Sequence, residues 1–186
     1  MKRLFDILFA VTALIIFSLP IVIISFLIKI SSPGPVLFFS KRVGADNKIF
    51  LMPKFRTMYL GTPDVATDKL ISPLNHITFI GKLLRFTSLD ELPQFYSIII
   101  GDMSVVGPRP ALYNQFNLIS LRTKYGINSL KPGLTGLAQI SGRDNLTIKE
   151  KVRFDQIYLE NNNMLHDLKI IFLTFIKILN FKNISH

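Results

Sequence analysis

The sequence predicts an α+β protein that is mainly helical, with one small β-hairpin. A long segment at residues 4–28 is almost wholly apolar, which is typical of a membrane helix. Residues 36–39 read as a short strand and residues 48–55 alternate weakly, as a second strand would, on either side of a turn at residues 41–47, which indicates a hairpin. Apolar residues at helical spacing recur through most of the remaining chain and predict surface and interfacial helices.

The composition limits the classes of partner. The 186 residues are enough for one domain with a core of its own, and 49% of them are hydrophobic. The net charge is +10, so the expected partners are anionic: nucleic acid, acidic lipid or phosphorylated small molecules. The chain has no cysteine, which excludes disulfides and thiolate chemistry. Its three histidines are too scattered for a zinc site.

Pro20 lies near the middle of residues 4–28 and argues against a plain membrane-spanning helix. As one continuous helix this segment would be roughly 37 Å long, which is enough to cross a bilayer. Proline removes a backbone hydrogen bond and breaks or kinks a helix, and Ser18 nearby can satisfy backbone groups that a break frees. We therefore expect a bent, re-entrant helix, with a kinked span as the alternative.

Basic residues on both sides of this segment indicate its orientation. Lys2 and Arg3 precede it, and Lys29 follows it. The positive-inside rule places such residues in the cytoplasm, so both ends are expected on that side of the membrane. We therefore expect a re-entrant helix–break–helix over residues 1–30 and a cytoplasmic, membrane-associated domain over residues 31–186.

The rest of the chain consists of short elements joined by turns. Amphipathic patterns predict helices at residues 78–86, 92–100, 111–124 and 147–161. Residues 165–181 predict a further helix that either packs in the core or lies in the membrane interface. Glycine, proline and short polar residues predict loops or turns at residues 31–35, 61–75, 131–136 and 140–144.

Asp90 and Glu91 are adjacent carboxylates that follow Arg85 by a few residues. Adjacent acids repel each other, so a fold that holds both usually needs them for a cation or a proton transfer. The structural alternative is a helix start, either as a capping box from Ser88 to Glu91 or as a helix beginning at Asp90. The second start fits better because it keeps Pro93 within the first turn. In either case Asp90 lies at a helix N-terminus, which favours negative charge.

Four cationic side chains are candidates for binding an anion near these acids. Lys54 and Arg56 are expected on one face of the second strand, because side chains alternate along a strand. Arg85 is close enough in sequence to reach the same anion as Asp90. Arg109 lies between two prolines, which stiffen the backbone and present a guanidinium suited to bidentate phosphate binding. The alternatives are a solvated or lipid-facing basic face for Lys54 and Arg56, and a structural role in its loop for Arg109.

Eight short motifs follow one another along the chain. They are SPGPVLF at 32–38, KRVG at 41–44, KFRTM at 54–58, LR at 84–85, SLDELPQ at 88–94, GDMS at 101–104, VGPRP at 106–110 and KPGLTG at 131–136. In this order, after an apolar segment with a central proline, they resemble the bacterial sugar transferases, the monotopic phosphoglycosyl transferases. The chain departs from the family pattern at Leu137, where a tryptophan is common, and at Ser18 and Pro20, which are commonly adjacent.

The resemblance implies a reaction and a location. A UDP-sugar gives its phosphosugar to undecaprenyl phosphate, which yields undecaprenyl diphosphate-sugar and UMP. This is the first membrane step in the synthesis of a surface glycan such as O-antigen, capsule or a glycoprotein glycan. The expected location is the bacterial inner membrane, with the catalytic domain and its surrounding helices on the cytoplasmic face. No nucleic-acid partner is expected, and a homodimer is compatible with the sequence.

The family's functional residues map onto the matching positions of this chain. The resemblance implies that Asp90 is a nucleophile that forms an acyl-phosphate with the sugar phosphate. Glu91 would assist, and both carboxylates would be ligands of Mg²⁺. The cations expected to bind the phosphates are Lys54, Arg56, Arg85 and Arg109.

Two other functions account for part of the sequence. A membrane-attached module that binds acidic lipid or nucleic acid would explain the charge but not the acidic pair, and its binding would be salt-sensitive and independent of Mg²⁺. A phosphohydrolase with the same carboxylate would pass the phosphosugar to water. Release of sugar phosphate without a lipid product would identify it.

Overall fold

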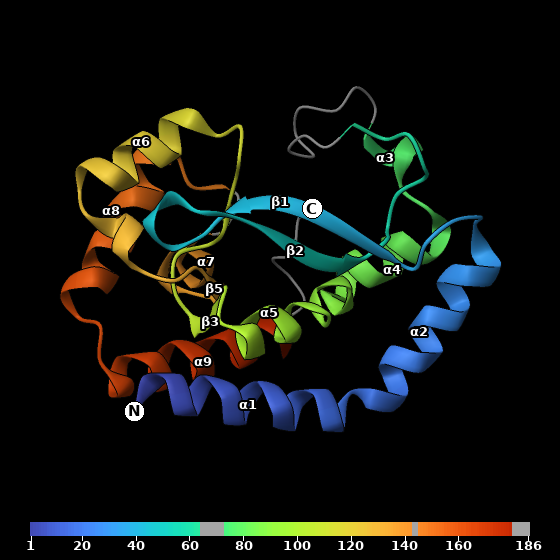
Figure 1. Cartoon of the computed structure of the whole chain (residues 1–186), viewed down its shortest axis with the longest axis horizontal. Helices are drawn as coiled ribbons and strands as arrows, with labels where there is room; N and C mark the ends of the chain where they lie inside the picture. Colours follow the sequence, from blue (N-terminus) through green and yellow to red (C-terminus); the bar gives the residue numbers. More distant parts are fainter. Residues whose placement is uncertain (64–72, 143–144, 180–186) are drawn as a thin grey trace.

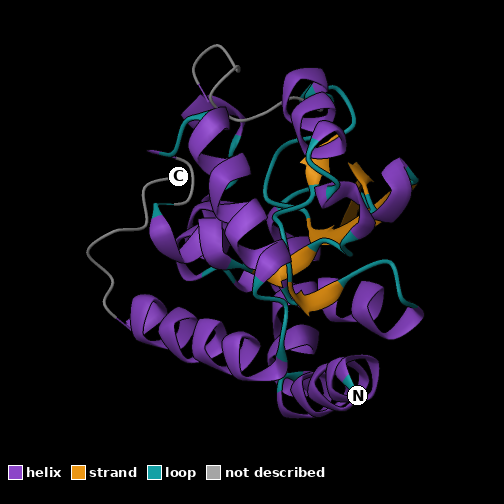
Figure 2. Cartoon of the chain, turned by 90° about the vertical axis from the view of Figure 1, so that its left-hand side faces the viewer, coloured by secondary structure: helices purple, strands orange, loops and turns teal. Residues whose placement is uncertain are grey.

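The computed structural model describes residues 1–63, 73–142 and 145–179 (Figure 1). This part of the chain is mainly helical and contains two small sheets, in agreement with the predicted fold class. Figure 2 shows the strands in the interior, with helices on more than one side of them. The division into two domains at residue 30 stays a prediction.

The N-terminal segment forms two helices, α1 (Lys2–Ile16) and α2 (Ser18–Ser31), which are bent by 62° relative to each other. Pro20 lies in the first turn of α2, where its missing N–H costs no helical hydrogen bond. The Ser18 hydroxyl donates to the Ile15 carbonyl across the bend (2.8 Å). Within the described residues, only this bent pair is long and apolar enough to be a candidate for membrane insertion, and no single helix is. The expected helix–break–helix is present, and its re-entrant course stays a prediction.

Helix α1 lies along the lower edge of Figure 1, and polar side chains attach it to the rest of the protein. The Arg3 guanidinium donates to the Ile99 carbonyl (2.7 Å) near the end of α5 (Gln94–Ile100). Asp6 is buried, and its carboxylate accepts hydrogen bonds from the Ser104 hydroxyl (2.9 Å) and the Val105 N–H (3.0 Å). The N-terminal charges therefore have protein partners, in addition to any effect on membrane orientation.

The first sheet is built on the predicted hairpin. Strand β1 (Leu37–Val43) pairs antiparallel with β2 (Ile49–Phe55), and its other edge pairs with β4 (Ala111–Leu112). The predicted turn at residues 41–47 is therefore too long at its start, because three of its residues belong to β1. All three pair with β2 inside the hairpin, and Arg42 and Val43 also pair with β4 on the other edge.

A second, parallel sheet was not expected. It consists of β3 (Ser104–Val106) and β5 (Gly133–Thr135), with Ser104 opposite Gly133. The predicted turn at residues 131–136 is wrong to that extent. Glycine is needed at position 107, because a Cβ there would lie 2.3 Å from the Lys131 carbonyl oxygen. Such close backbone approach pairs two strands that are too short to show a sequence pattern.

The remaining elements are helices that surround the sheets. They are α3 (Pro73–His76), α4 (Phe79–Thr87), α5, α6 (Phe116–Lys124), α7 (Leu137–Ser141), α8 (Ile148–Glu160) and α9 (Met164–Leu179). The predicted helix at residues 111–124 begins later, because its first two residues join the sheet as β4. The predicted turn at residues 140–144 is displaced by the end of α7. Most of the expected loop at residues 61–75 lies outside the described residues.

Helix α9 has two apolar faces with different surroundings. Ile170 is buried in the core, so the prediction that this helix packs there is confirmed for one face. Leu165, Phe172 and Phe175 on the same helix are 80%, 65% and 56% exposed. Helix α1, whose Lys2 pairs with Asp167 in the first turn of α9, also exposes large apolar side chains. The placement of these faces in a membrane interface stays a prediction.

Candidate active site

The acidic pair lies in a short 3₁₀ turn, Leu89–Glu91, between α4 and α5. Ser88 ends α4 in a left-handed conformation (φ 57°) and makes no capping hydrogen bond through its side chain. Neither helix start considered from the sequence is therefore correct: Ser88 forms no capping box, and the preferred start at Asp90 is wrong because α5 begins at Gln94, with Pro93 as its N-cap. Leu89 and Leu92 pack against the core, which fixes the turn and holds the two acids on its other side.

Lys54 is the cation closest to this pair. It lies near the end of β2, and its ammonium is 2.8 Å from Glu91 Oε1 and 3.7 Å from Asp90 Oδ2. The Arg109 guanidinium approaches the same Glu91 oxygen to 3.8 Å. The structure thus brings together segments that are far apart in sequence, and two of the four predicted cations contact the acidic pair.

Asp90 is buried (8% exposed), and its ionisation is perturbed by that burial. Desolvation raises the pKa of Asp90, and the neighbouring Glu91 charge raises it further. Lys54, Arg85 and Arg109 oppose this rise by stabilising the charged carboxylate. Among the described residues none donates a hydrogen bond to the Asp90 carboxylate, whose only ion pair is the long contact with Lys54. Its lone pairs are therefore available to a substrate.

Arg85 reaches the site from α4. Its Nε donates to the Thr57 hydroxyl (2.9 Å), which fixes the position of the guanidinium group at its Nε. Burial lowers the pKa of Arg85, and the Asp90 charge acts in the opposite direction. Since arginine keeps its proton at physiological pH in any case, Arg85 contributes a positive charge close to Asp90.

Arg56 has different partners from the other predicted cations. Its guanidinium donates to the Ser32 carbonyl (2.8 Å), the Ser32 hydroxyl (2.9 Å) and the Pro33 carbonyl (2.6 Å). Strand β2 ends at Phe55, so the alternation that would place Lys54 and Arg56 on one face does not continue to Arg56. Arg56 instead joins the end of α2 to the hairpin. Its role in phosphate binding stays a prediction that these contacts do not support.

Two polar residues beside the acidic pair had been given no role from the sequence. Gln94 is buried, and its Nε2 has no hydrogen-bond partner among the described residues. Arg42 donates to the Pro110 carbonyl (3.1 Å). Both line a small pocket with Lys54, Glu91 and Arg109. Gln94 belongs to the SLDELPQ motif, which is the signal that could have identified it.

The family described as "Bacterial sugar transferase" matches residues 1–181. The chain belongs to the bacterial sugar transferase family. The resemblance inferred from the eight motifs is therefore confirmed.

Relatives in this family differ in length. The chain is 42% identical to the "UDP-glucose:undecaprenyl-phosphate glucose-1-phosphate transferase" of Klebsiella pneumoniae, over 95% of this chain and 39% of that protein. It is 40% identical to the "Exopolysaccharide production protein ExoY" of Rhizobium meliloti, over 93% of this chain and 83% of that protein. It is 35% identical to the "Undecaprenyl-phosphate galactose phosphotransferase" of Salmonella typhimurium, over 94% of this chain and 39% of that protein. The chain thus spans about two fifths of the first and third of these relatives.

In this member of the family, the acidic pair is the place to test for a metal ion. The described residues contain no group of three or more histidine, aspartate and glutamate side chains that could hold one. Asp90 and Glu91 supply two carboxylates, and Mg²⁺ is commonly bound by one or two carboxylates together with phosphates and water. The donor set therefore fits Mg²⁺ whose coordination a diphosphate completes, and it lacks the nitrogen ligands typical of zinc.

Proposed function

We propose that this chain transfers a phosphosugar from a UDP-sugar to undecaprenyl phosphate, with release of UMP. Two relatives support the acceptor, because their names specify sugar-phosphate transfer to undecaprenyl phosphate, and one of those names specifies a UDP-sugar. The observation that carries the proposal is the Asp90 carboxylate, which is buried, receives no hydrogen bond from the described residues and is surrounded by Lys54, Arg85 and Arg109. An enzyme of this kind begins the synthesis of a surface glycan.

In the first step an Asp90 carboxylate oxygen attacks the β-phosphorus of the UDP-sugar. A bond forms between that oxygen and phosphorus, and the bond from phosphorus to the bridging oxygen breaks. UMP leaves with the electron pair, and an aspartyl-phosphosugar remains on the enzyme. Asp90 has to be ionised to attack, and the three nearby cations favour its charged form.

In the second step an oxygen of undecaprenyl phosphate attacks the phosphorus of the aspartyl-phosphosugar. The bond from phosphorus to the aspartyl oxygen breaks, which restores the Asp90 carboxylate and releases undecaprenyl diphosphate-sugar. Lys54 and Arg109 are placed to neutralise the phosphate charge beside Glu91. Mg²⁺ held by Asp90 and Glu91 would neutralise diphosphate charge and stabilise the leaving group.

The exposed apolar surface supports association with the inner membrane, with the catalytic domain on the cytoplasmic face of that membrane. Leu4, Leu8 and Ile15 on α1 are 63%, 59% and 69% exposed, and Phe26 on α2 is 65% exposed. A bilayer would cover such side chains, as it would those of α9, and it would bring the lipid acceptor to the height of the site. A re-entrant course for α1 and α2 leaves both ends on the side where UDP-sugars are made.

The first experiment measures UMP release from a panel of UDP-sugars with Mg²⁺, with and without undecaprenyl phosphate. Lipid-dependent UMP release with one sugar is expected and would also identify the donor. Release of sugar phosphate to water without a lipid product would instead indicate a phosphohydrolase. No UMP from any donor, together with salt-sensitive binding of acidic vesicles or nucleic acid, would indicate a binding module.

The membrane course has its own test, since the chain has no native cysteine. A single cysteine inserted between Met1 and Lys2 is treated with a membrane-impermeant thiol reagent from each side of the inner membrane. Labelling from the cytoplasmic side is expected for the re-entrant helix pair. Labelling from the periplasmic side would show that the segment spans the membrane.

A further inference from the structure

The position of the Arg109 guanidinium is not explained by its own contacts. Its side chain is 36% exposed, and among the described residues its only ion pair is the 3.8 Å contact with Glu91. A long and partly exposed side chain with one distant partner is weakly ordered by that partner. The backbone from which it projects must therefore determine where its charge lies.

That backbone is held by its carbonyl groups. Pro108 and Pro110 have no N–H, so their carbonyls are the backbone groups that can be anchored there. The Pro108 carbonyl accepts from the Gly133 N–H (2.9 Å), and the Pro110 carbonyl accepts from Arg42 (3.1 Å). The carbonyl of Arg109 itself accepts from Arg122 Nη1 (2.9 Å).

Arg122 is in turn fixed by Asp155. From α6, its Nε and Nη2 both contact Asp155 Oδ2 on α8, at 2.9 and 2.8 Å. The two side chains are 11% and 3% exposed, so solvent competes little for this pair. Arg122 thus uses one edge of its guanidinium for Asp155 and the remaining nitrogen for the Arg109 carbonyl. A lysine has a single nitrogen and cannot reproduce this forked arrangement.

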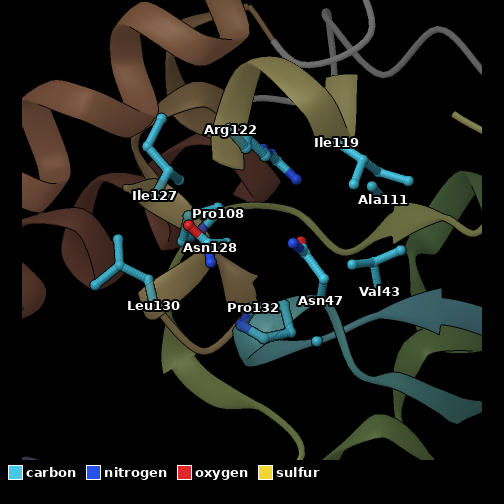
Figure 3. Close-up of a pocket in the computed structure, with 11 residues that line it drawn as sticks. Val43, Asn47, Pro108, Ala111, Ile119, Arg122, Ile127, Asn128, Leu130 and Pro132 are labelled. Carbon is cyan, nitrogen blue, oxygen red and sulfur yellow. The ribbon is translucent and has the colours of Figure 1, made fainter. Parts of the chain in front are cut away.

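A pocket lies beside the hydrogen bond between Arg122 and the Arg109 carbonyl. Close packing of side chains therefore cannot hold the backbone there in place of that hydrogen bond. Figure 3 shows Arg122 extending from its helix into the pocket, whose wall includes Pro108 and Asn47. Apolar side chains such as Ile119 and Leu130 form other parts of the wall. On this side, therefore, the turn that carries Arg109 depends on the Arg122 hydrogen bond for its position.

We propose that Arg122, held by Asp155, is a positioning residue that places the Arg109 guanidinium at the acidic pair for the phosphates of the donor. This inference rests on the proposed function and adds a role for α6 and α8. Arg122 does not itself contact the acidic pair in any hydrogen bond or ion pair described for it. Its effect should therefore depend entirely on the presence of Arg109.

A double-mutant cycle tests this dependence through kcat/KM for the UDP-sugar. Arg122→Met should lower kcat/KM by about 10- to 100-fold, with the KM for undecaprenyl phosphate little changed, whereas Arg122→Lys should lose less. In an Arg109→Met background the Arg122→Met change should have almost no further effect. Independent, multiplicative losses would overturn the proposal, because they would show that Arg122 acts by another route.

Controls separate positioning from folding. Arg153→Met removes the same charge from an exposed position on α8 and should leave kcat/KM unchanged. If Arg122→Met does not fold, the same cycle is run with Asp155→Asn, which keeps the side-chain volume and removes the charge that holds Arg122. If Asp155→Asn lowers kcat/KM by the same factor with and without Arg109, the proposal is also overturned.

If the proposed function itself is wrong, a different result is expected. A wild-type chain that releases no UMP from any donor contradicts the transferase assignment, whatever the variants do. In that event the cycle is repeated with the dissociation constant for UDP as the readout. Non-additive losses in UDP affinity would support the positioning role alone, and additive losses would overturn it.

Discussion

Buried acidic side chains in this protein have two very different kinds of surroundings. Asp167 on α9 accepts a hydrogen bond from the Tyr158 hydroxyl (2.7 Å) and pairs with the Lys2 ammonium. Asp6 on α1 accepts two hydrogen bonds as well. Asp90 is buried to a similar degree but receives no hydrogen bond from the described residues. Asp167 connects α9 to α1 and α8, and Asp6 connects α1 to β3, whereas Asp90 keeps its lone pairs free.

The difference separates stability from reactivity. A buried carboxylate that is fully hydrogen-bonded contributes to folding, because removing it leaves buried donors unsatisfied. A buried carboxylate with cations nearby but no donors destabilises the fold when ionised and is a better nucleophile. Substitutions of the two kinds of acid should therefore affect different measurements.

The largest expected effect is the loss of turnover in Asp90→Asn. Removing a nucleophile commonly costs a factor of roughly 10³ or more, so UMP release should fall by at least that amount. The thermal unfolding temperature should stay the same or rise, since a buried charge is removed. Asp46→Asn makes the same chemical change in an exposed turn and should have no effect. Near-normal turnover in Asp90→Asn would contradict the nucleophile assignment.

Lys54→Met should have the next largest effect. It removes the cation nearest to both acids, and kcat/KM for the donor should fall by about 10²-fold because the phosphate charge is less well neutralised. Lys48→Met, at an exposed position of the same hairpin, is the matched control. Equal rates for the two variants would show that Lys54 only supports the fold.

Asp6→Ala should alter stability rather than chemistry. It leaves the Val105 N–H and the Ser104 hydroxyl buried without an acceptor, which should lower the free energy of unfolding by about 2 kcal/mol. Denaturant titration of the detergent-solubilised protein measures this loss. The kcat/KM of the folded fraction should stay within about threefold of wild type, because the hydrogen bonds of Asp6 go to Ser104 and Val105 rather than to the acidic pair or its cations. A larger loss of activity would show that α1 also positions the acidic pair.

A smaller effect is expected in the pH dependence of stability. The folded-state pKa of Asp90 lies above its unfolded value, so the folded state binds this proton more tightly. The free energy of unfolding should therefore fall as pH rises from the ordinary aspartate value, near 3.9, through the raised one. Asp90→Asn should lack this part of the fall, while the similarly raised pKa of Asp155 affects both proteins alike. Parallel stability curves for the two proteins would contradict the raised pKa.

The smallest effect is expected at an exposed acid. Glu150 forms a capping box with Thr147 at the start of α8, and these hydrogen bonds lower the pKa of Glu150. Thr147→Val should lower the unfolding temperature by a few degrees at neutral pH, with unchanged turnover. The difference should shrink as acid protonates Glu150. A loss of activity would indicate that α8 is coupled to the site more strongly than through Asp155 alone.

Part of the site could be predicted from the sequence, and part could not. The motifs identified Asp90, Glu91, Lys54, Arg85 and Arg109, and the structure places all five near one another. Arg56 belongs to the same motif as Lys54 but contacts the end of α2, because strand alternation ends one residue before it. Its direction depends on where the strand ends, and neighbouring residues do not determine that.

The residues that hold the site in place were not found from the sequence. Arg42, Arg122 and Asp155 act through hydrogen-bond partners that are distant along the chain. The same is true of β3 and β5, which pair across about 30 residues and are too short for a periodic pattern. No local signal marks such contacts.

The sequence by itself determined the helical periods, the break near Pro20, the order of the motifs and therefore the family. These depend on neighbouring residues: a proline disrupts its own helix, and a motif is a run of adjacent positions. Only the tertiary structure decided the burial of Asp90, the direction of Arg56 and the anchoring of Arg109. Burial, desolvation and hydrogen bonding depend on which distant segments pack together, so the free carboxylate and its surrounding cations exist only in the folded chain.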